Sequence, residues 1–445
     1  MTELLQLPNE VLDMISDCLG AQDLGALRLT SKRLNAASLP SFSRGYFKTR
    51  YVMFSRLSLQ NLIEIAQHPV FGPSVRTLEI CLDRFVQNLD HRFCPAKHEA
   101  DEIVAMEEDR PQTLVKMGSI FGARSSDEDG RRTDERNVSS QDSDEASVDR
   151  AAYMFLWEEQ EHEIMPELAQ AYITRALIAL TNVKVIIISN THRPWGALAH
   201  NRQTGIPLTN ALGDSDEWPF VGQVVDVVLT AIVTSGAAIG RLAITAGDNK
   251  EAITPDILRL TRAHLQYYGD LPSSLTELVL YISDEGSRNS EHEWVHDLSG
   301  FIGVFRQLTY LGVVIRPHHS QFSSHMYRLK GLGTKFQVPN LQHLVLEKVY
   351  CSTEDLAAVI LRHKATLQSF TLAQVVVSDG IERLRALFAL IRAHIARLKL
   401  SIYVLFSGCQ LIMYPECKDE RPELCFDVGG SHEDWTTAIH AIKLC

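Results

Sequence analysis

The chain has 445 residues, of which 45% are hydrophobic and 22% charged, an ordinary composition for a globular protein of several domains. With 55 acidic against 43 basic residues, its formal net charge of −12 argues against a nucleic-acid-binding surface as the main function. The longest apolar run, residues 221–234, is too short to span a bilayer and contains Asp226.

The first stretch, residues 4–47, is predicted to form three short helices. Pro8 suits the first turn of a helix because its missing N–H would be unpaired there. Glu10 in that turn faces the positive end of the helix dipole. The apolar residues that follow are too many for one amphipathic stripe: Val11, Leu12, Met14, Ile15, Cys18 and Leu19. A helix that is apolar on two sides must bury one side in its own domain and offer the other to a partner.

Terminating and capping residues divide this stretch into its helices. Gly20 is expected to end the first helix in a left-handed conformation. Asp23 is expected to cap the second helix, and Ser31 the third. A bundle of about forty residues is too small to be securely stable alone. A binding partner is therefore expected on thermodynamic grounds.

The order of these residues resembles the F-box. The string that carries the resemblance is Leu7-Pro8-x-Glu10, Leu12, Ile15, Leu19, Asp23-Leu24, Leu27-Arg28 and Ser31-Lys32-Arg33. The resemblance implies docking on the Skp-type adaptor of cullin–RING ubiquitin ligases, and through it on the cullin and RING subunits. Carried over by position, the adaptor-binding residues are Leu7, Pro8, Ile15, Leu19, Leu24 and Leu27, with Lys32 and Arg33 at the rim. Leu34 stands where many F-boxes carry an aromatic residue, and an ordinary capped helical hairpin is the alternative.

Beyond this module, residues 57–68 are predicted to form a helix. Residues 75–80 are predicted to form a strand with apolar residues at offsets 0, 3 and 5. The same offsets recur at Leu180-Val183-Val185, Ile239-Leu242-Ile244, Leu275-Leu278-Leu280, Leu308-Leu311-Val313, Leu341-Leu344-Leu346, Leu367-Phe370-Leu372 and Ile395-Leu398-Leu400. Helix-like segments lie between them, at residues 151–181, 220–235, 254–264, 293–306, 353–363 and 380–394.

A strand followed by a helix at near-constant spacing predicts an irregular α/β solenoid. The spacing and the L-x-x-L-x-L core resemble leucine-rich repeats, and F-box proteins with such repeats are a known group. The asparagine that usually follows this core is not evident in these copies. A plain α/β domain is therefore the alternative to a leucine-rich-repeat-like fold.

Four regions follow from these patterns. They are an F-box at residues 1–50, a linking helix and first repeat-like strand at 51–96, an acidic disordered insertion at 97–150, and a leucine-rich-repeat-like substrate-binding domain at 151–445. No flexible linker is expected between the F-box and the repeat-like domain, so the F-box would fix the direction in which that domain points.

The insertion holds 15 acidic against 8 basic residues, and its second half has almost no large apolar residue, so burial cannot offset the entropy of ordering. Ser125, Ser126 and Ser139 each have an acid three residues on, which suits an acid-directed kinase. A solvated loop with chance spacing is the alternative reading of these serines.

Candidate sites for catalysis or metal binding are few. No nucleophile elbow, phosphate-binding loop or zinc-protease motif occurs. Two groups could supply zinc ligands: Cys81, His91, Cys94 and His98, and Cys409, Cys417, Cys425 and His432. The first group fits no common zinc spacing, and Cys425 lies in a strand-like run, so buried thiols and loop residues are the better account. The histidines at 318, 319 and 325 fit a solvated loop. No metal or other cofactor is expected.

The remaining candidates are two tryptophans in the interruption at residues 189–219. Trp195 and Trp218 could anchor a target protein. Packing against their own domain is the alternative for both.

The sequence thus predicts a non-catalytic substrate-recognition subunit of an SCF-type ubiquitin ligase, with an unidentified protein as its substrate. A scaffold that binds the adaptor but degrades nothing is one alternative, and an α/β enzyme is another. Eight scattered cysteines without a signal peptide read as reduced thiols, which places the protein in the cytoplasm or nucleus. No nucleic-acid or membrane partner is expected.

Overall fold

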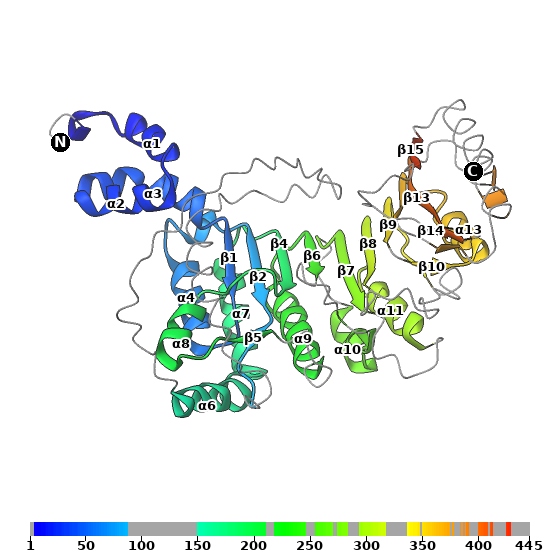
Figure 1. The fold of residues 1–445 in the computed structure, drawn as a ribbon, viewed down its shortest axis with the longest axis horizontal. Helices are drawn as coiled ribbons and strands as arrows, with labels where there is room; N and C mark the ends of the chain where they lie inside the picture. Colours follow the sequence, from blue (N-terminus) through cyan, green and yellow to red (C-terminus); the bar gives the residue numbers. More distant parts are fainter. Residues whose placement is uncertain are drawn as a thin grey trace, which may run out of the picture. The chain divides into compact units, whose positions relative to one another are not determined.

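A computed structural model describes the backbone of the chain over a defined set of segments (Figure 1). These are residues 4–87, 149–210, 218–245, 253, 255–269, 274–283, 293–316, 336–347, 349–373, 376–377, five positions between 383 and 390, 399–407, 410–412 and 424–428. The chain divides into two compact units. The first comprises residues 1–45, 87–155 and 198–207, and the second comprises residues 46–86, 156–197 and 208–445.

The first unit contains the three N-terminal helices that the sequence predicted. A single 3-10 turn, Leu4–Gln6, precedes α1 (Asn9–Asp17), α2 (Ala21–Thr30) and α3 (Lys32–Tyr46). Leu12, Leu24 and Leu34, one from each helix, are buried. These leucines form the small apolar centre of the module, which explains their apolar character in the sequence.

The second unit is built on a mostly parallel sheet. Its principal strands are β1 (Thr49–Val52), β2 (Thr77–Cys81), β4 (Val185–Ser189), β6 (Arg241–Ile244), β7 (Glu277–Ser283), β8 (Tyr310–Arg316), β9 (His343–Glu347), β11 (Ser369–Ala373) and β13 (Lys399–Ser407). Over the described residues each of these strands pairs in parallel with the next one along the chain. Two antiparallel strands, β14 (Gln410–Ile412) and β15 (Leu424–Val428), join β13.

Short strands form two further ladders outside this sheet. One pairs β3 (Asp83–Arg84) with β5 (Thr209–Asn210), and the other pairs β10 (Tyr350–Cys351) with β12 (Val376–Val377).

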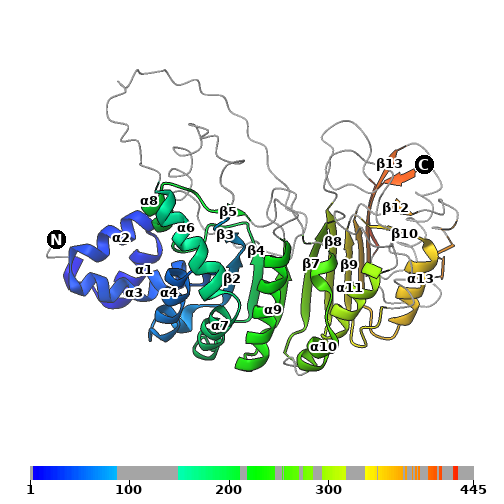
Figure 2. The same ribbon diagram turned by 90° about the horizontal axis from the view of Figure 1, so that it is seen from below.

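Helices connect the parallel strands and cover one face of the sheet (Figures 1 and 2). The helices of the second unit are α4 (Arg56–Gln67), α7 (Glu167–Ala179), α9 (Trp218–Ser235), α10 (Arg262–Tyr268), α11 (Glu293–Gly303) and α13 (Thr353–Arg362), with single turns at η2 (Gly72–Ser74), η3 (a π-helix, Glu159–Ile164) and η5 (Pro255–Leu258). Two further helices, α6 (Arg150–Glu158) and α8 (Ala197–Thr204), lie largely in the first unit. Helix α7 packs between α4 and α9. Among the described helices, none combines the length and the apolar character that crossing a bilayer requires.

One register relates all of the parallel strands. The residues paired across the sheet at the second strand position, beginning from β2, are Leu78, Ile186, Leu242, Leu278, Leu311, Leu344, Phe370 and Leu400. With the exception of the last, whose side chain is outside the described set, all of these are buried in one continuous core with the helices. Because side chains alternate between faces along a strand, this register keeps every strand apolar on the helix side.

A shared carbonyl precedes each of the seven strands from β2 to β11 in this register. The main-chain oxygen of Lys48 accepts hydrogen bonds from the N–H groups of Arg76 and Thr77, at 2.8 and 3.0 Å. The same two-to-one pattern is repeated by the carbonyls of Arg76, Lys184, Gly240, Thr276, Thr309 and Gln342. The first residues of each of these strands are therefore hydrogen-bonded to the segment that precedes the neighbouring strand.

The predicted repeat pattern holds in most copies and is wrong in three places. The prediction overlooked β1, because Arg50 occupies the position that an apolar residue fills elsewhere. The copy read as Leu180-Val183-Val185 is displaced by three residues, since Ile186 pairs with Leu78. The copy at 395–400 is displaced by two, since Leu400 pairs with Phe370. In the run around Val185 nearly every residue is apolar, so the pattern alone could not fix the frame.

The helical predictions also needed correction. The single segment predicted at 151–181 is three elements, α6, η3 and α7. The segment predicted at 254–264 is a 3-10 turn followed by α10, which ends at Tyr268. Of the predicted helix at 380–394 the structure describes five positions, and all five are helical. The acidic insertion with its three serines lies outside the described residues except at 149–150.

A buried amide joins three separate segments of the second unit. Gln160, in the π-helix η3, is almost fully buried. Its Nε2 donates to the carbonyl of Phe54 at 2.7 Å, and its Oε1 accepts from the N–H of Phe85 at 3.0 Å. The side chain thus satisfies two main-chain groups that burial would otherwise leave without water.

We expect Gln160→Leu to lower the free energy of unfolding by about 2–4 kcal/mol, because it leaves a buried carbonyl and a buried N–H unpaired. Urea unfolding monitored by circular dichroism would measure the change. Gln368→Leu is the matched control, since Gln368 is exposed and only its main chain is hydrogen-bonded in the described part of the chain. Equal midpoints for both variants would contradict the assigned role of Gln160.

His363 should make stability depend on pH. Its Nδ1 lies 2.7 Å from the carbonyl of Val359, and its Nε2 accepts from the N–H of Val338 at 3.2 Å, so the ring must be neutral. Burial lowers the pKa of His363 below its ordinary value of 6.5. The unfolded chain therefore takes up the proton first, and the stability that His363 contributes is complete above about pH 6.5 and is lost as the pH falls below it.

The measurement is the urea midpoint between pH 8 and pH 5. Wild type should lose more stability over this range than His363→Asn. The free energy of unfolding of His363→Asn should already be lower than that of wild type at pH 8, by about 1–3 kcal/mol. His296→Gln, at an exposed position, should follow the wild-type curve. A His363→Asn curve parallel to wild type would exclude this histidine as the source.

Candidate functional site

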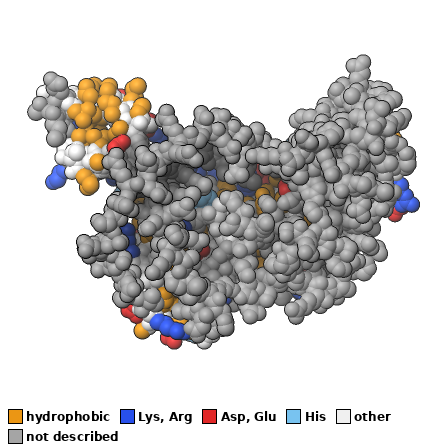
Figure 3. All heavy atoms as spheres, in the orientation of Figure 1, with side chains coloured by type: hydrophobic (Ala, Val, Ile, Leu, Met, Phe, Trp, Pro, Cys, Tyr) orange, Lys and Arg blue, Asp and Glu red, His pale blue; other side chains and the backbone are white. Residues whose placement is uncertain are grey.

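The three N-terminal helices keep some apolar side chains buried and hold others in solvent. Leu12 and Leu24 are each only 2% exposed, whereas Met14 is 69% and Leu29 90% exposed. Val11 is also exposed. Figure 3 shows hydrophobic side chains gathered on this module. We name Val11, Met14 and Leu29 the exposed apolar set. Large apolar side chains concentrated in solvent on so small a module are typical of a protein-docking surface.

Main-chain and arginine contacts fix the start of the module. Pro8 directly precedes α1, and its carbonyl accepts from the N–H of Leu12 at 3.1 Å. Nη2 of Arg33, at the start of α3, donates to the carbonyl of Leu7 at 3.0 Å. Arg33 therefore holds the entry to α1 against α3, and its role includes this structural bond as well as any contact at a rim.

A second set of contacts positions α3 against α2. Oγ of Ser31 accepts from the N–H of Leu34 at 3.1 Å, as predicted for the cap of the third helix. Nε of Arg28 donates to Oδ1 of Asn35 at 3.0 Å, and its guanidinium lies 3.7 Å from the ring centre of Phe42. These contacts set the face of α2 that carries Leu29.

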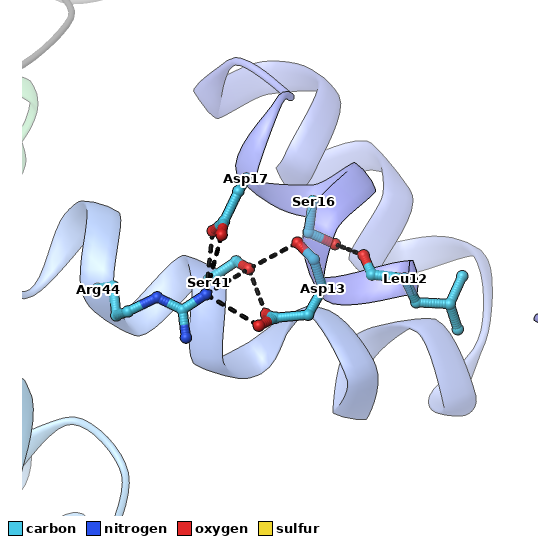
Figure 4. A network of polar contacts seen from close by, with 6 residues as sticks. All are labelled: Leu12, Asp13, Ser16, Asp17, Ser41 and Arg44. Carbon is cyan, nitrogen blue, oxygen red and sulfur yellow. Dashed lines mark hydrogen bonds and ion pairs between the residues drawn. The ribbon is translucent and has the colours of Figure 1, made fainter. Parts of the chain in front are cut away.

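A polar network joins α1 to α3 (Figure 4). Nη2 of Arg44 lies 3.0 Å from the Asp13 carboxylate and 3.1 Å from the Asp17 carboxylate. Oγ of Ser41 donates to the same Asp13 carboxylate. The hydrogen bond from Ser41 is the largest cause of a lowered pKa at Asp13, which Arg44 lowers further. The network holds the two helices together on the polar side of the module.

The structure places the predicted adaptor-binding residues in three environments. Leu7, Ile15, Leu19 and Leu27 are half-buried, whereas Pro8, Lys32 and Arg33 are exposed. Leu24 is buried, so it supports the module from inside. Met14 and Leu29 were not among the predicted site residues, although both are more exposed than any leucine that was. The sequence signal for Met14 is the number of apolar residues in α1: because so small a domain cannot bury all of them, some must be exposed.

Two predicted helix boundaries are wrong. Gly20 does not end α1: that helix ends at Asp17, and Gly20 has extended backbone and directly precedes α2. Asp23 is not the cap of α2 but lies within its first turn, where its charge still faces the positive end of the helix dipole. The early start of α2 at Ala21 explains both differences.

These helices define a class of element, a small helical docking module with a buried centre and an exposed apolar set. Residues 4–39 match the F-box domain. The chain therefore carries an N-terminal F-box domain, which implies binding to a Skp-type adaptor and suggests a substrate-adaptor role in an SCF-type ubiquitin ligase. Proteins with this domain are typically non-catalytic subunits of such ligases. No curated protein matches the chain.

The second unit carries polar side chains on the sheet face opposite the buried leucines. At the first position of five successive strands the register aligns Arg241, Glu277, Tyr310, His343 and Ser369, which we name the polar row. Nη1 of Arg241 lies 3.6 Å from the Glu277 carboxylate, and Nδ1 of His343 lies 2.7 Å from Oγ of Ser369. Burial is the main cause of a raised pKa at Tyr310, which lies between these two pairs.

The two predicted tryptophans lie in different settings. Trp195 is 49% exposed, and its ring centre lies 4.9 Å from the Arg50 guanidinium. Trp218 is the first residue of α9, and its side chain is outside the described set. Of the two tryptophans, only Trp195 therefore has a side chain whose contacts the structure describes.

The predicted alternatives for metal binding lie mostly outside the described residues. This applies to His91, Cys94 and His98, to the group at 409–432 except the backbone of β15, and to the histidines at 318–325. Cys81 is buried in β2, and burial raises the pKa of its thiol. Over the described part of the chain, no three histidine, cysteine or acidic side chains gather closely enough to hold a metal ion.

Proposed function

We propose that this chain is the substrate-recognition subunit of an SCF-type ubiquitin ligase of the cytoplasm or nucleus. The F-box docks on the Skp-type adaptor, and the sheet unit binds a target protein. The observation that carries the proposal is the F-box match at residues 4–39, in a module that leaves Met14 and Leu29 in solvent. Catalysis belongs to other subunits, and this chain acts by bringing its target near them.

The sheet unit, in this proposal, is an irregular leucine-rich-repeat-like solenoid. Support comes from the strand order, which follows the chain without crossing, and from the shared carbonyl at each strand entry. In such an array each repeat stabilises its neighbours, and the face opposite the helices is available to bind a partner.

The polar row is the proposed target-binding surface of that face. It combines an ion pair, a half-buried tyrosine and a histidine within five adjacent strands. Tyrosine and arginine are enriched among residues that dominate protein interfaces, because they bring a large contact area together with hydrogen-bonding groups. Trp195 and Trp218 remain further candidates for contact with the target.

We expect Met14→Glu with Leu29→Glu to prevent adaptor binding while the module stays folded. Both side chains are exposed, so charges there cost little stability, but each would be buried without a partner at a docked surface. A loss of about 2 kcal/mol or more, roughly thirtyfold in affinity, is expected. Co-purification of the adaptor with the full-length chain is the measurement.

The matched control is Leu57→Glu, at an exposed apolar position on α4 in the second unit. It should leave adaptor recovery unchanged. Substitution of Leu7 and Pro8 by alanine should also abolish recovery, but these residues take part in holding α1 in place, so that result alone is ambiguous. Full recovery of the adaptor by the Met14/Leu29 variant would contradict the docking assignment.

Target binding should depend on the polar row. We expect Tyr310→Ala with His343→Ala to remove target proteins from an affinity purification while the adaptor is retained, because truncation of central interface residues typically costs about 2 kcal/mol or more each. Mass spectrometry compares the variant with wild type. Tyr267→Ala, at an exposed tyrosine on α10, is the control. An unchanged set of co-purified proteins would count against this surface.

A further inference from the structure

One residue breaks the apolar register of the sheet. In β1, Arg50 pairs with Leu78 of β2 and so occupies the second strand position, where the next eight strands all carry leucine, isoleucine or phenylalanine. Phe47 and Val52, on either side of Arg50, are buried as their counterparts Val75 and Ile80 are. Arg50 is therefore a charged residue at a strand position that faces the core and that is apolar in the other strands.

The surroundings of Arg50 are mostly aromatic. Its side chain is buried, with the whole residue 7% exposed. Nη1 donates to the carbonyl of Tyr46 at 3.3 Å, and the guanidinium lies 4.8 Å from the ring centre of Phe47 and 4.9 Å from that of Trp195. Burial lowers the pKa of Arg50 to about 10. A guanidinium carries five N–H donors, so the described contacts satisfy only a part of its capacity.

Several other arginines of the described chain are bound by carboxylates. Arg56 contacts Glu159 at 2.5 Å and Glu163 at 2.6 Å, and Arg44 contacts two aspartates. Within the described residues, no carboxylate lies within 4 Å of Arg50. Aromatic faces attract a cation but do not replace the oxygen acceptors that it loses on leaving water. The described residues thus hold this guanidinium in position and place no carboxylate against it, although a carboxylate is the kind of group that a guanidinium binds best.

Trp195 lies at the solvent side of this arrangement. Its side chain is half exposed while it contacts a buried arginine. The main-chain N–H of Trp195 donates to the carbonyl of Tyr51 at 3.0 Å, which fastens the loop to the outer edge of β1. Gly196 follows with a φ of 97°, a conformation that side chains rarely allow. The backbone of the loop is thereby anchored at the edge strand, with the indole beside the buried guanidinium.

We propose that Arg50 and Trp195 form a binding site for an anionic oxygen group, a carboxylate or a phosphate, on the target protein. The inference rests on the proposed function and names the chemistry that the target must carry. Arg50 binds the anion through paired N–H donors, and the indole packs against the neighbouring part of the target. The buried carboxylate of Glu79 in β2, the register partner of Tyr51, is hydrogen-bonded to Ser189 and His192 on the opposite face of the sheet and does not occupy the site.

The test uses the full-length chain labelled with 5-fluorotryptophan. Fluorine NMR resolves the five tryptophans, and Trp195→Phe assigns the resonance of Trp195. Sodium acetate and sodium phosphate are titrated at constant ionic strength, with sodium chloride as the reference salt. We expect a saturable shift of the Trp195 resonance with at least one of the two anions, and the stronger of the two identifies the group. Arg50→Gln should weaken this binding by about tenfold or more.

Arg306→Gln, which removes an exposed arginine elsewhere in the second unit, is the matched control and should bind as wild type does. If Arg50→Gln fails to fold, Arg50→Lys replaces it and should also weaken binding, because an ammonium cannot bind an anion through a planar pair of donors. No shift of the Trp195 resonance in wild type, or an equal shift in the Arg50 variants, would overturn the inference.

The titration needs neither the adaptor nor a target. A chain that recovers no adaptor but binds the anion at Trp195 therefore contradicts the proposed function alone. A chain that recovers the adaptor but shows no shift contradicts only the inference about Arg50.

Discussion

The shared carbonyl at the entry of each parallel strand is the constraint on which the second unit depends. One main-chain oxygen accepts from two successive N–H groups at the start of the neighbouring strand, from Lys48 through to Gln342. These bonds fix the register of each strand relative to its neighbour. Because a shift of one residue would turn every leucine of a strand to the wrong face, the core can be continuous only if these entries hold. The helices cover the apolar face that this register produces.

The sequence located most of the strands in the correct frame where the residues flanking the apolar positions were not themselves all aliphatic. This was so for Leu242, Leu278, Leu311 and Leu344, whose frames agree with the sheet register. It failed in the run around Val185, where the frame is decided by pairing with β2 and not by local pattern. It failed again at β1, where the residue in the apolar position is charged. In both places the frame of the strand is determined by its pairing with β2 and cannot be read from the local apolar pattern.

The F-box illustrates a different limit. The order of residues identified the module, and Ser31 was assigned correctly as a cap because its role is local. The exposure of Met14 and Leu29 depends on how three helices pack, which one helix's pattern does not determine. The Asp13–Ser41–Arg44 network likewise joins residues about thirty positions apart. Contacts within a helical turn could be predicted, whereas contacts between helices could not.

The bond from the N–H of Trp195 to the carbonyl of Tyr51 has a consequence for solubility. Strand β1 is the edge of the sheet, and a free edge is a template on which a second chain can add a strand and begin to aggregate. The loop that bears Trp195 occupies part of this edge. A chain that lost the loop's anchorage would gain a route to self-association, so the backbone of this loop protects solubility independently of what its indole binds.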